Sequence, residues 1–251
     1  MRIPRLPRLR RRPQRRLIAL LTFRDEMRFL PGLFENLEGQ VDGLIGLDDQ
    51  SSDASRAYVE AQPLTLDVLA VPPGSQGDNE DGRNHKRLIE AGWDHADWLL
   101  GIDADERLER DFRRRAETEI DAAERGGTTA LWVPFRELWG ANDRMRMDGI
   151  WGEKRKACLF KADRGHRFHE RRLHSIWAPW PPLAGEYPAA DLRLYHLRMI
   201  RPEDRQARMD LYNRLDPDRK LQAIGYDYLV DEDGIRLEPL EPGREYRPLP
   251  G

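Results

Sequence analysis

Hydrophobic and polar positions alternate in blocks along the first part of this 251-residue chain. Short apolar runs predict four buried strands, at 17–22, 42–49, 64–71 and 97–105. Segments with polar caps and helical spacing predict helices between them, at about 26–40, 51–61 and 83–95. Strands that alternate with helices in this way favour right-handed βαβ units and a mostly parallel sheet.

The pattern changes after a long amphipathic helix, expected from about Glu109 to Arg125 and ended by two glycines. Four apolar stretches follow without regular helices between them, at 129–140, 156–163, 171–177 and 191–200. They predict mixed or antiparallel strands. Pro202 opens a last helix that should reach about Leu215, since proline is favoured in a first turn. We therefore expect an α/β fold with a mostly parallel central sheet flanked by helices, and a mixed or antiparallel second half.

The same pattern divides the chain into three parts. Residues 1–16 hold eight arginines, three prolines and no acidic residue, which predicts a disordered basic arm. Residues 17–215 are expected to form a single domain with two halves, 17–107 and 108–215. Residues 216–251 are rich in proline and are expected to form an irregular C-terminal extension.

Composition narrows the class of protein. The 42 basic and 45 acidic residues nearly balance, and a single cysteine, Cys158, excludes an internal disulfide framework and fits a reducing compartment. No apolar run approaches the ~18 residues that a membrane span requires. We expect a cytoplasmic protein, peripheral at the inner membrane face if the basic arm meets anionic lipid; a solvated tail is the alternative. The acidic body disfavours nucleic acid as a partner.

The clearest chemical signal lies at the end of the fourth predicted strand, where Asp103-Ala104-Asp105-Glu106 gathers three carboxylates. Asp103 and Asp105 share one face of an extended chain, and carboxylates placed so repel unless a cation lies between them or one takes up a proton. Mg²⁺ binds through one or two carboxylates and substrate phosphates, and Mn²⁺ suits the same ligands. The spacing predicts a metal that holds a phosphate-containing ligand. A solvated turn before the next helix is the alternative.

Polar and acidic residues also follow the first two predicted strands. They are Thr22, Asp25 and Glu26 after the first, and Asp48 and Asp49 after the second. Ligands of open α/β sheets bind beyond the carboxyl ends of the strands. We therefore expect these side chains to converge with the later aspartates on one edge of the sheet.

With these landmarks in this order, the chain resembles the family 2-type glycosyltransferases of the GT-A fold, which transfer sugars from nucleotide-diphospho-sugar donors. The resemblance covers about residues 17–200. Thr22, Asp25 and Glu26 stand in the region of the family's T-x-N-E cluster, without its asparagine. The family's D-D-G-S-x-D, A-R-N and D-x-D motifs correspond to DDQSSD (48–53), GRN (82–84) and DAD (103–105). Gln50 replaces the glycine, which permits backbone conformations that glutamine disfavours.

The resemblance implies an inverting transferase that uses a UDP- or GDP-sugar and Mn²⁺ or Mg²⁺, with a glycan or lipid-linked acceptor. Asp48 or Asp49 would bind the nucleobase or ribose, and Thr22 would line the same pocket with Asp25 and Glu26 in its region. Arg83 would lie near the diphosphate. Asp103 would contact the ribose and the ion, and Asp105 would coordinate the ion. A non-catalytic protein that binds nucleotides or sugars on the same fold is the alternative.

The second half supplies candidates for the remaining roles. Inverting transfer requires a carboxylate that deprotonates the acceptor hydroxyl, and the candidates are Glu170, which we prefer, Asp148 and Glu153. His174 and His196 are candidates for a third metal ligand, although a lone histidine on an apolar strand is more often a core residue. Five tryptophans after residue 130 favour stacking on sugar faces, with two or three of them in the core.

Overall fold

The computed structural model describes residues 15–71, 80–169, 171, 175–180, 182 and 186–247. The strands are β1 (Leu17–Phe23), β2 (Gly43–Asp48), β3 (Thr65–Ala70), β4 (Trp98–Asp103), β5 (Glu106–Leu108), β6 (Ala130–Glu137), β7 (Arg144–Arg146), β8 (Arg155–Lys161), β9 (Leu194–His196) and β10 (Leu237–Pro239). The helices are α1 (Leu30–Leu37), α2 (Ser55–Glu60), α3 (Asp81–Gly92), α4 (Phe112–Arg125), α5 (Ile150–Glu153), α6 (Pro202–Leu215) and the 3-10 turn η1 (Asp227–Leu229).

Eight strands form one sheet in the order β3-β2-β1-β4-β8-β6-β9-β5. The first four are parallel to one another. Strand β8 runs antiparallel to both β4 and β6, and β9 runs parallel to β6 but antiparallel to β5. The expected α/β fold, parallel in its first half and mixed in its second, is confirmed.

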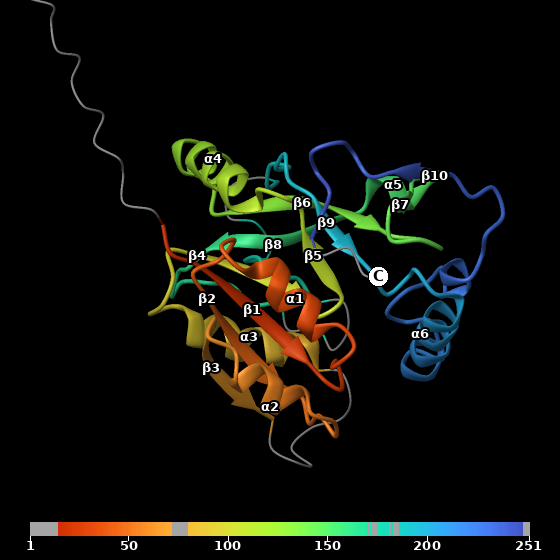
Figure 1. Ribbon diagram of the computed structural model, residues 1–251, viewed down its shortest axis with the longest axis horizontal. Helices are drawn as coiled ribbons and strands as arrows, with labels where there is room; N and C mark the ends of the chain where they lie inside the picture. The colour runs from red at the N-terminus through yellow and green to blue at the C-terminus, as the bar shows by residue number, and fades with distance from the viewer. Residues whose placement is uncertain are drawn as a thin grey trace, which may run out of the picture.

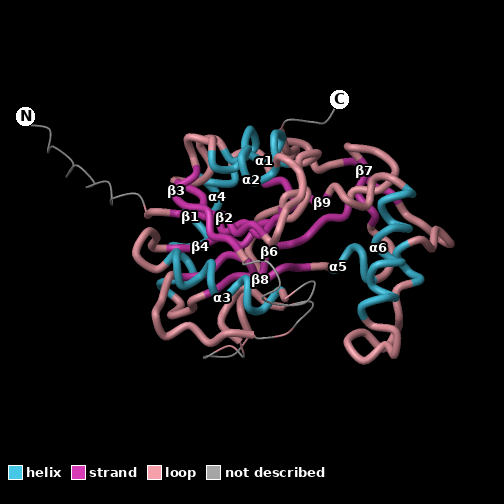
Figure 2. Tube along the Cα trace, turned by 90° about the horizontal axis from the view of Figure 1, so that it is seen from below, coloured by secondary structure: helices cyan, strands magenta, loops and turns pink. Residues whose placement is uncertain are grey.

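Strands β1, β2 and β4 of the parallel half are buried on both faces, which explains their nearly unbroken apolar sequences, whereas the edge strand β3 is partly exposed. Residues Leu17 to Leu21 of β1 are each at most 1% exposed. Figure 2 shows α1, α2 and α4 on one face of the sheet and α3 on the opposite face. Burial of both faces leaves the ends of the strands as the place where polar side chains of the sheet can meet a ligand.

The register of the central strands aligns their carboxyl ends. Thr22 of β1 pairs with Asp103 of β4, and Phe23 pairs with Asp48 of β2. Three motifs that are distant in sequence therefore lie side by side at one sheet edge. Figure 1 shows that β1 points towards the side of the molecule where α6 lies.

Several elements differ from their predicted extents. The first helix begins at Leu30 rather than near residue 26, because the preceding residues turn and Pro31 occupies its first turn. In the stretch 171–177, the described residues form no strand, and in 191–200 only 194–196 do. The elements β5, β7, α5 and β10 have three or four residues, too few to show a period in the sequence.

The structure describes the chain from Arg15, inside the expected basic arm, whose residues 1–14 lie outside the described part. The Arg15 guanidinium pairs with three acids of α4, Glu117 (2.9 Å), Asp121 and Glu124 (2.7 Å). At the other end, β10 pairs with β7 and Tyr246 is fully buried, so the described part of 216–251 packs on the body. None of the helices in the described ranges has the length and apolar character needed to span a membrane.

Candidate functional site

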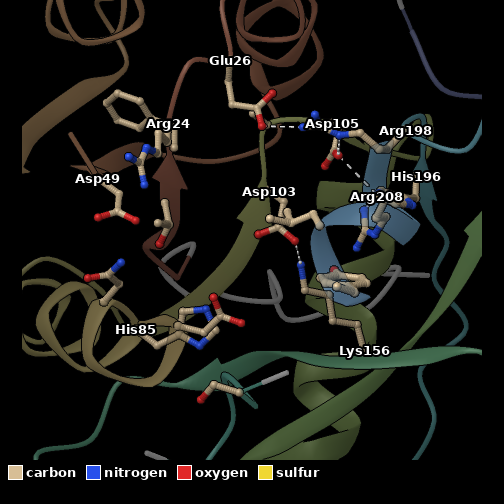
Figure 3. Close-up of a pocket in the computed structure, with 18 of the residues that line it drawn as sticks. Arg24, Glu26, Asp49, His85, Asp103, Asp105, Lys156, His196, Arg198 and Arg208 are labelled. Atoms are coloured by element: carbon tan, nitrogen blue, oxygen red, sulfur yellow. Dashed lines mark hydrogen bonds and ion pairs between the residues drawn. The ribbon is translucent and has the colours of Figure 1, made fainter. Parts of the chain in front are cut away.

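A cavity of about 550 Å³ opens at the carboxyl ends of β1, β2 and β4. We call it the first cavity. Helix α3 closes it on one side, and α6 with the end of β9 closes it on the other (Figure 3). Its charged walls include Arg24, Glu26, Asp49, Asp103, Asp105, Lys156, His196, Arg198, Asp204 and Arg208.

A partly buried lysine forms ion pairs with two carboxylates of the acidic cluster. The Lys156 ammonium of β8 donates to Asp103 Oδ2 at 2.9 Å and to Glu106 Oε1 at 2.6 Å. Burial and the neighbouring Asp103 charge raise the pKa of Glu106 to about 8, although Lys156 opposes the shift. Glu106 is 1% exposed, whereas the Asp103 side chain is 49% exposed, so Asp103 presents the accessible carboxylate.

The second aspartate is held by an arginine and a histidine. Arg198 Nε donates to Asp105 Oδ2 at 2.6 Å, and another nitrogen of Arg198 donates to Glu26. His196 Nε2 lies 3.3 Å from the same Asp105 oxygen. Burial works against the charged form of Asp105, but Arg198 and His196 outweigh it and hold its pKa well below the usual range.

A second carboxylate bonds to the His196 ring nitrogen that faces away from Asp105 and so orients the ring. Glu137 at the end of β6 bonds to His196 Nδ1 and accepts from the Lys154 ammonium at 2.7 Å. Burial opposes a charge on His196, but Glu137 and Asp105 together raise its pKa to about 9. A carboxylate on the far nitrogen of a histidine is the arrangement that fixes a metal-binding imidazole.

Asp105 and His196 fit a divalent ion. Adjacent ligands of an ion with bonds of about 2.0–2.1 Å lie about 3 Å apart, close to the 3.3 Å between Asp105 Oδ2 and His196 Nε2. The described residues contain no cluster of three such ligands, so phosphate oxygens or water would have to complete the shell. A bound ion would replace the proton that Glu137 and Asp105 favour on His196.

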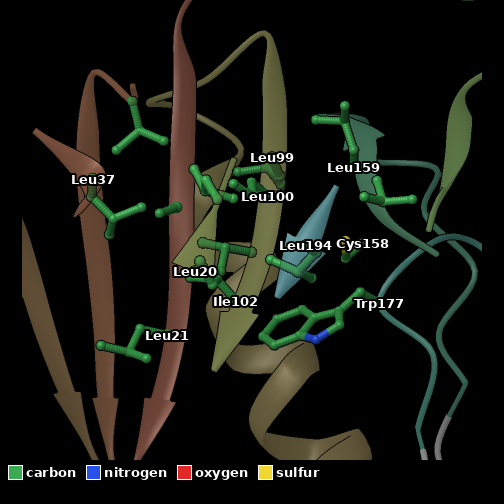
Figure 4. Close-up of a cluster of buried hydrophobic side chains, with 14 of the residues drawn as sticks. Leu20, Leu21, Leu37, Leu99, Leu100, Ile102, Cys158, Leu159, Trp177 and Leu194 are labelled. Atoms are coloured by element: carbon green, nitrogen blue, oxygen red, sulfur yellow. The ribbon is translucent and has the colours of Figure 1, made fainter. Parts of the chain in front are cut away.

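An aromatic stack forms the floor between α3 and β4. The His85 and Trp177 rings lie 3.6 Å apart between centroids and nearly parallel, and both line the first cavity. Burial lowers the pKa of His85 to about 3, so its ring is neutral. Trp177 packs into the main core near Ile102 and Leu194 (Figure 4). A Cβ on Gly101 would lie 2.2 Å from the Trp177 ring, so only glycine lets this indole cross β4.

A second cavity, of about 370 Å³, continues from the first. The two share wall residues, namely Asp103, Lys156, Ser175, Trp177, Arg208 and Tyr212. The remainder is lined by the aromatic side chains of Trp132, Phe135 and Tyr228 and by the charged side chains of Glu106, Glu137, Lys154 and Arg155. Trp132 also borders a further hollow with Trp180, whereas Trp139 and Trp151 belong to a separate buried cluster. The geometry therefore offers one polar chamber and one partly aromatic chamber with a common wall.

No family model matches the chain. Two uncharacterized proteins, from Mycobacterium bovis and Mycobacterium tuberculosis, are each 24% identical to it over 91% of this chain and 62% of their own length. The chain thus spans about three fifths of the curated relatives it matches. Among solved structures, Staphylococcus aureus TarS aligns with a TM-score of 0.52 and 9% identity, over 87% of this chain and 46% of TarS. The Mycobacterium tuberculosis glucosyl-3-phosphoglycerate synthase overlaps half of the chain with a TM-score of 0.35, 19% identity and 45% of its own length covered.

The fold is GT-A. Within it, six of the residues singled out from the sequence line the first cavity together, namely Thr22, Glu26, Asp49, Asp103, Asp105 and His196. Three others do not line it. Asp48 is buried and accepts from the Ser51 amide, Asp25 holds the amides of residues 52 and 53, and Arg83 is exposed beside Glu80. On this GT-A frame, Asp48 and Asp25 shape the loop that presents Asp49.

The candidates for a general base are placed differently. Asp148 lies outside both cavities. Arg146 donates to both of its carboxylate oxygens, and the Arg236 backbone amide donates to one of them. Glu153 is exposed on α5 and also lies outside them. Neither carboxylate is positioned to take a proton from a hydroxyl bound there. Glu170 and His174 lie outside the described residues.

The wall residues that the sequence did not single out include His85, Arg198, Arg208 and Tyr212. The sequence does contain an indication for Arg198, because it stands two positions after His196 and would point to the same side of an extended segment. Arg208 looks like one more charge on a polar helix. Lys156 stands in a run of three basic residues, 154–156, a pattern that is typical of a solvated turn.

Proposed function

We propose that this chain is a glycosyltransferase that binds a nucleotide-diphospho-sugar in the first cavity and transfers the sugar to an acceptor in the second. The observation that carries the proposal is the meeting of Thr22, Asp49, Asp103 and Asp105 in one cavity at the sheet edge. The GT-A fold supports it, because in open α/β sheets this edge is where ligands bind.

In this proposal the donor lies in the first cavity with its nucleoside near β2 and its diphosphate near β9 and α6. Asp49, at the end of β2, is placed to accept hydrogen bonds from the nucleobase or ribose. Asp103, the accessible carboxylate, is placed for the ribose next to it. The diphosphate would then lie beside Asp105 and His196, near Arg198 of the segment after β9 and Arg208 of α6.

Asp105 and His196 are the residues that would hold Mn²⁺ or Mg²⁺, and Glu137 would orient His196. Such an ion neutralises the charge that develops on a departing diphosphate. Arg198 and Lys156 keep the two aspartates ionised before any ligand binds, because each donates to one of them. Trp177 and His85 exclude water from the floor of the cavity.

The acceptor, a glycan or a lipid-linked sugar, fits the second cavity, because Trp132, Phe135 and Tyr228 offer aromatic faces to the C–H faces of a sugar ring. Inversion requires a carboxylate behind the acceptor hydroxyl. Glu170 is our proposal for that base. The adjacent Arg171 carbonyl accepts from the Gly82 amide at 2.9 Å, and α3 contributes Asp81 and Asn84 to the first cavity.

A thermal-shift experiment with UDP and GDP, each with and without Mn²⁺, tests the proposal. TarS has been crystallised in complex with UDP, so UDP is the first ligand to test. We expect a rise in melting temperature that needs the ion and that disappears in Asp105→Asn. Asp94→Asn, an exposed change two residues beyond the end of α3, is the matched control and should keep the full shift.

Turnover distinguishes an enzyme from a binding protein. Release of UDP from a UDP-sugar, lost in Asp105→Asn but retained in Asp94→Asn, supports transfer. Nucleotide binding without release of UDP from any donor would favour the non-catalytic alternative. A melting temperature that no nucleotide changes, with or without the ion, would refute the proposal.

A further inference from the structure

Arg208 reaches the common wall of the two cavities from α6. It lines both cavities, and Figure 3 shows its guanidinium beside His196 and close to the Asp105 cluster. The bond that breaks in a sugar transfer joins the donor's anomeric carbon to its diphosphate, at the end of the donor that faces the acceptor. A cation on the wall between the two sites is therefore close to the leaving group.

Two other cations that line the first cavity, Lys156 and Arg198, already bond to carboxylates. Lys156 donates to Asp103 Oδ2 and to both Glu106 oxygens, at 2.9, 2.6 and 2.8 Å. Arg198 is bonded to Asp105 and to Glu26. A phosphate that claimed either cation would have to break a buried ion pair, which is costly.

Arg208 is different, because within the described residues it forms no ion pair with a carboxylate. Its contacts are His196 Nε2, 3.3 Å from one guanidinium nitrogen, and Tyr212, whose hydroxyl accepts from it and whose ring lies 5.3 Å from the guanidinium carbon. A guanidinium has five donors and no acceptor. These two contacts leave donors for an anion, and a planar fork of donors matches phosphate.

Contacts of a neighbouring arginine fix the position of helix α6, which carries Arg208. Arg205, one turn earlier on the same face, is its one buried residue among those described. It donates to the carbonyls of Met199 and Ile200 and to Glu232, and it stacks on Trp139. The helix is therefore anchored through a charged residue, with Arg208 and Tyr212 directed at the cavities.

We propose that Arg208 contacts the diphosphate of the donor and neutralises it as it leaves. This role rests on the proposed function. The bond from the anomeric carbon to the diphosphate oxygen breaks, and its electron pair stays on that oxygen. The acceptor oxygen bonds to the anomeric carbon and gives its proton to the carboxylate base. Arg208 keeps its own protons and donates hydrogen bonds to the phosphate oxygens, so its contribution grows as negative charge develops.

Inorganic pyrophosphate tests the contact without any assumption about the nucleobase. Its affinity for the full chain is measured by calorimetry, once with Mn²⁺ and once in EDTA. We expect Arg208→Gln to weaken pyrophosphate binding by about 10- to 100-fold in whichever condition the wild type binds it. Arg208→Lys should recover part of the loss. Arg201→Gln, an exposed change at the start of the same helix, should lose nothing.

Kinetics with the UDP-sugar that the wild type turns over best provide a second readout. Arg208→Gln should lower kcat more than it raises KM, whereas a merely structural role would lower stability and leave both parameters of the folded fraction unchanged. A wild type that turns over a donor but shows no effect of Arg208→Gln on pyrophosphate affinity or kcat would overturn this assignment alone. A wild type that binds no nucleotide and no pyrophosphate would overturn the proposed function as well.

Discussion

Gln50 offers a sharp test of the loop that presents Asp49 to the first cavity. Its backbone has a φ of 65°, in the left-handed region that glycine adopts freely. Glycine is the residue that the related motif carries at this position. The neighbouring Ser51 amide donates to Asp48 Oδ1 at 2.9 Å, so the turn is fixed from both sides. Glutamine thus stands at a position whose backbone conformation glycine would adopt without a steric cost.

Gln50→Gly should therefore stabilise the protein. A left-handed conformation costs an L-residue about 1–2 kcal/mol, and glycine avoids this cost. Glycine also makes the unfolded chain more flexible, which offsets about 0.5–1 kcal/mol. The difference predicts a gain of about 0.5–1 kcal/mol in the free energy of unfolding. In a chain of this length, such a gain raises the melting temperature by about 1–4 °C.

Urea unfolding followed by tryptophan fluorescence measures the gain, at an unchanged dependence on denaturant. Gln50→Ala is the matched control, because alanine also has a Cβ and should show no such gain. Nucleotide affinity should stay at the wild-type level in both variants, since the backbone already has the required shape. A glycine variant no more stable than the alanine variant would refute the reasoning.

Three further predictions concern the site and its surroundings. Gly101→Ala should lower the free energy of unfolding by about 1–3 kcal/mol and weaken nucleotide binding, because the added Cβ would collide with Trp177. The loss of stability should be smaller in a Trp177→Leu background, and chemical denaturation of the four proteins of this double-mutant cycle measures the difference. His166 is 7% exposed, and burial lowers its pKa to about 4. The folded state therefore binds fewer protons than the unfolded state between pH 6.5 and 4, so stability should fall by up to about 3 kcal/mol as the pH drops through this window. His166→Phe should remove that part of the acid sensitivity in urea titrations at pH 7 and pH 4. Asp148→Asn should leave kcat for donor turnover unchanged, because its side chain lies outside both cavities; a large loss would return Asp148 to the list of bases.

The sequence predicted those site residues whose place follows from the residues next to them in the chain. Thr22, Asp49 and Asp103 were placed correctly because each follows an apolar run, and parallel strands bring such ends together. His196 was one of two candidates, and only its position opposite Glu106 in the β5–β9 pair brings it to Asp105. Lys156 could not be assigned, because its partners are about fifty residues earlier in the chain and come within reach only when β8 pairs with β4.

The cluster of carboxylates at the end of β4 shows how long-range pairing makes an unfavourable local sequence possible. Asp103, Asp105 and Glu106 carry like charges within four positions and repel one another, and the guanidinium of the adjacent Arg107 donates to backbone carbonyls rather than to either aspartate. The antiparallel strand β8 supplies Lys156 to Asp103 and Glu106, and the segment after β9 supplies Arg198 to Asp105. Basic side chains from the mixed half of the sheet therefore stabilise the carboxylates at the end of the parallel strand β4. Because each aspartate is already paired, a ligand that brings its own negative charge must find a further cation. Arg208 is one such cation on the cavity wall, and a metal ion held by Asp105 and His196 would be another.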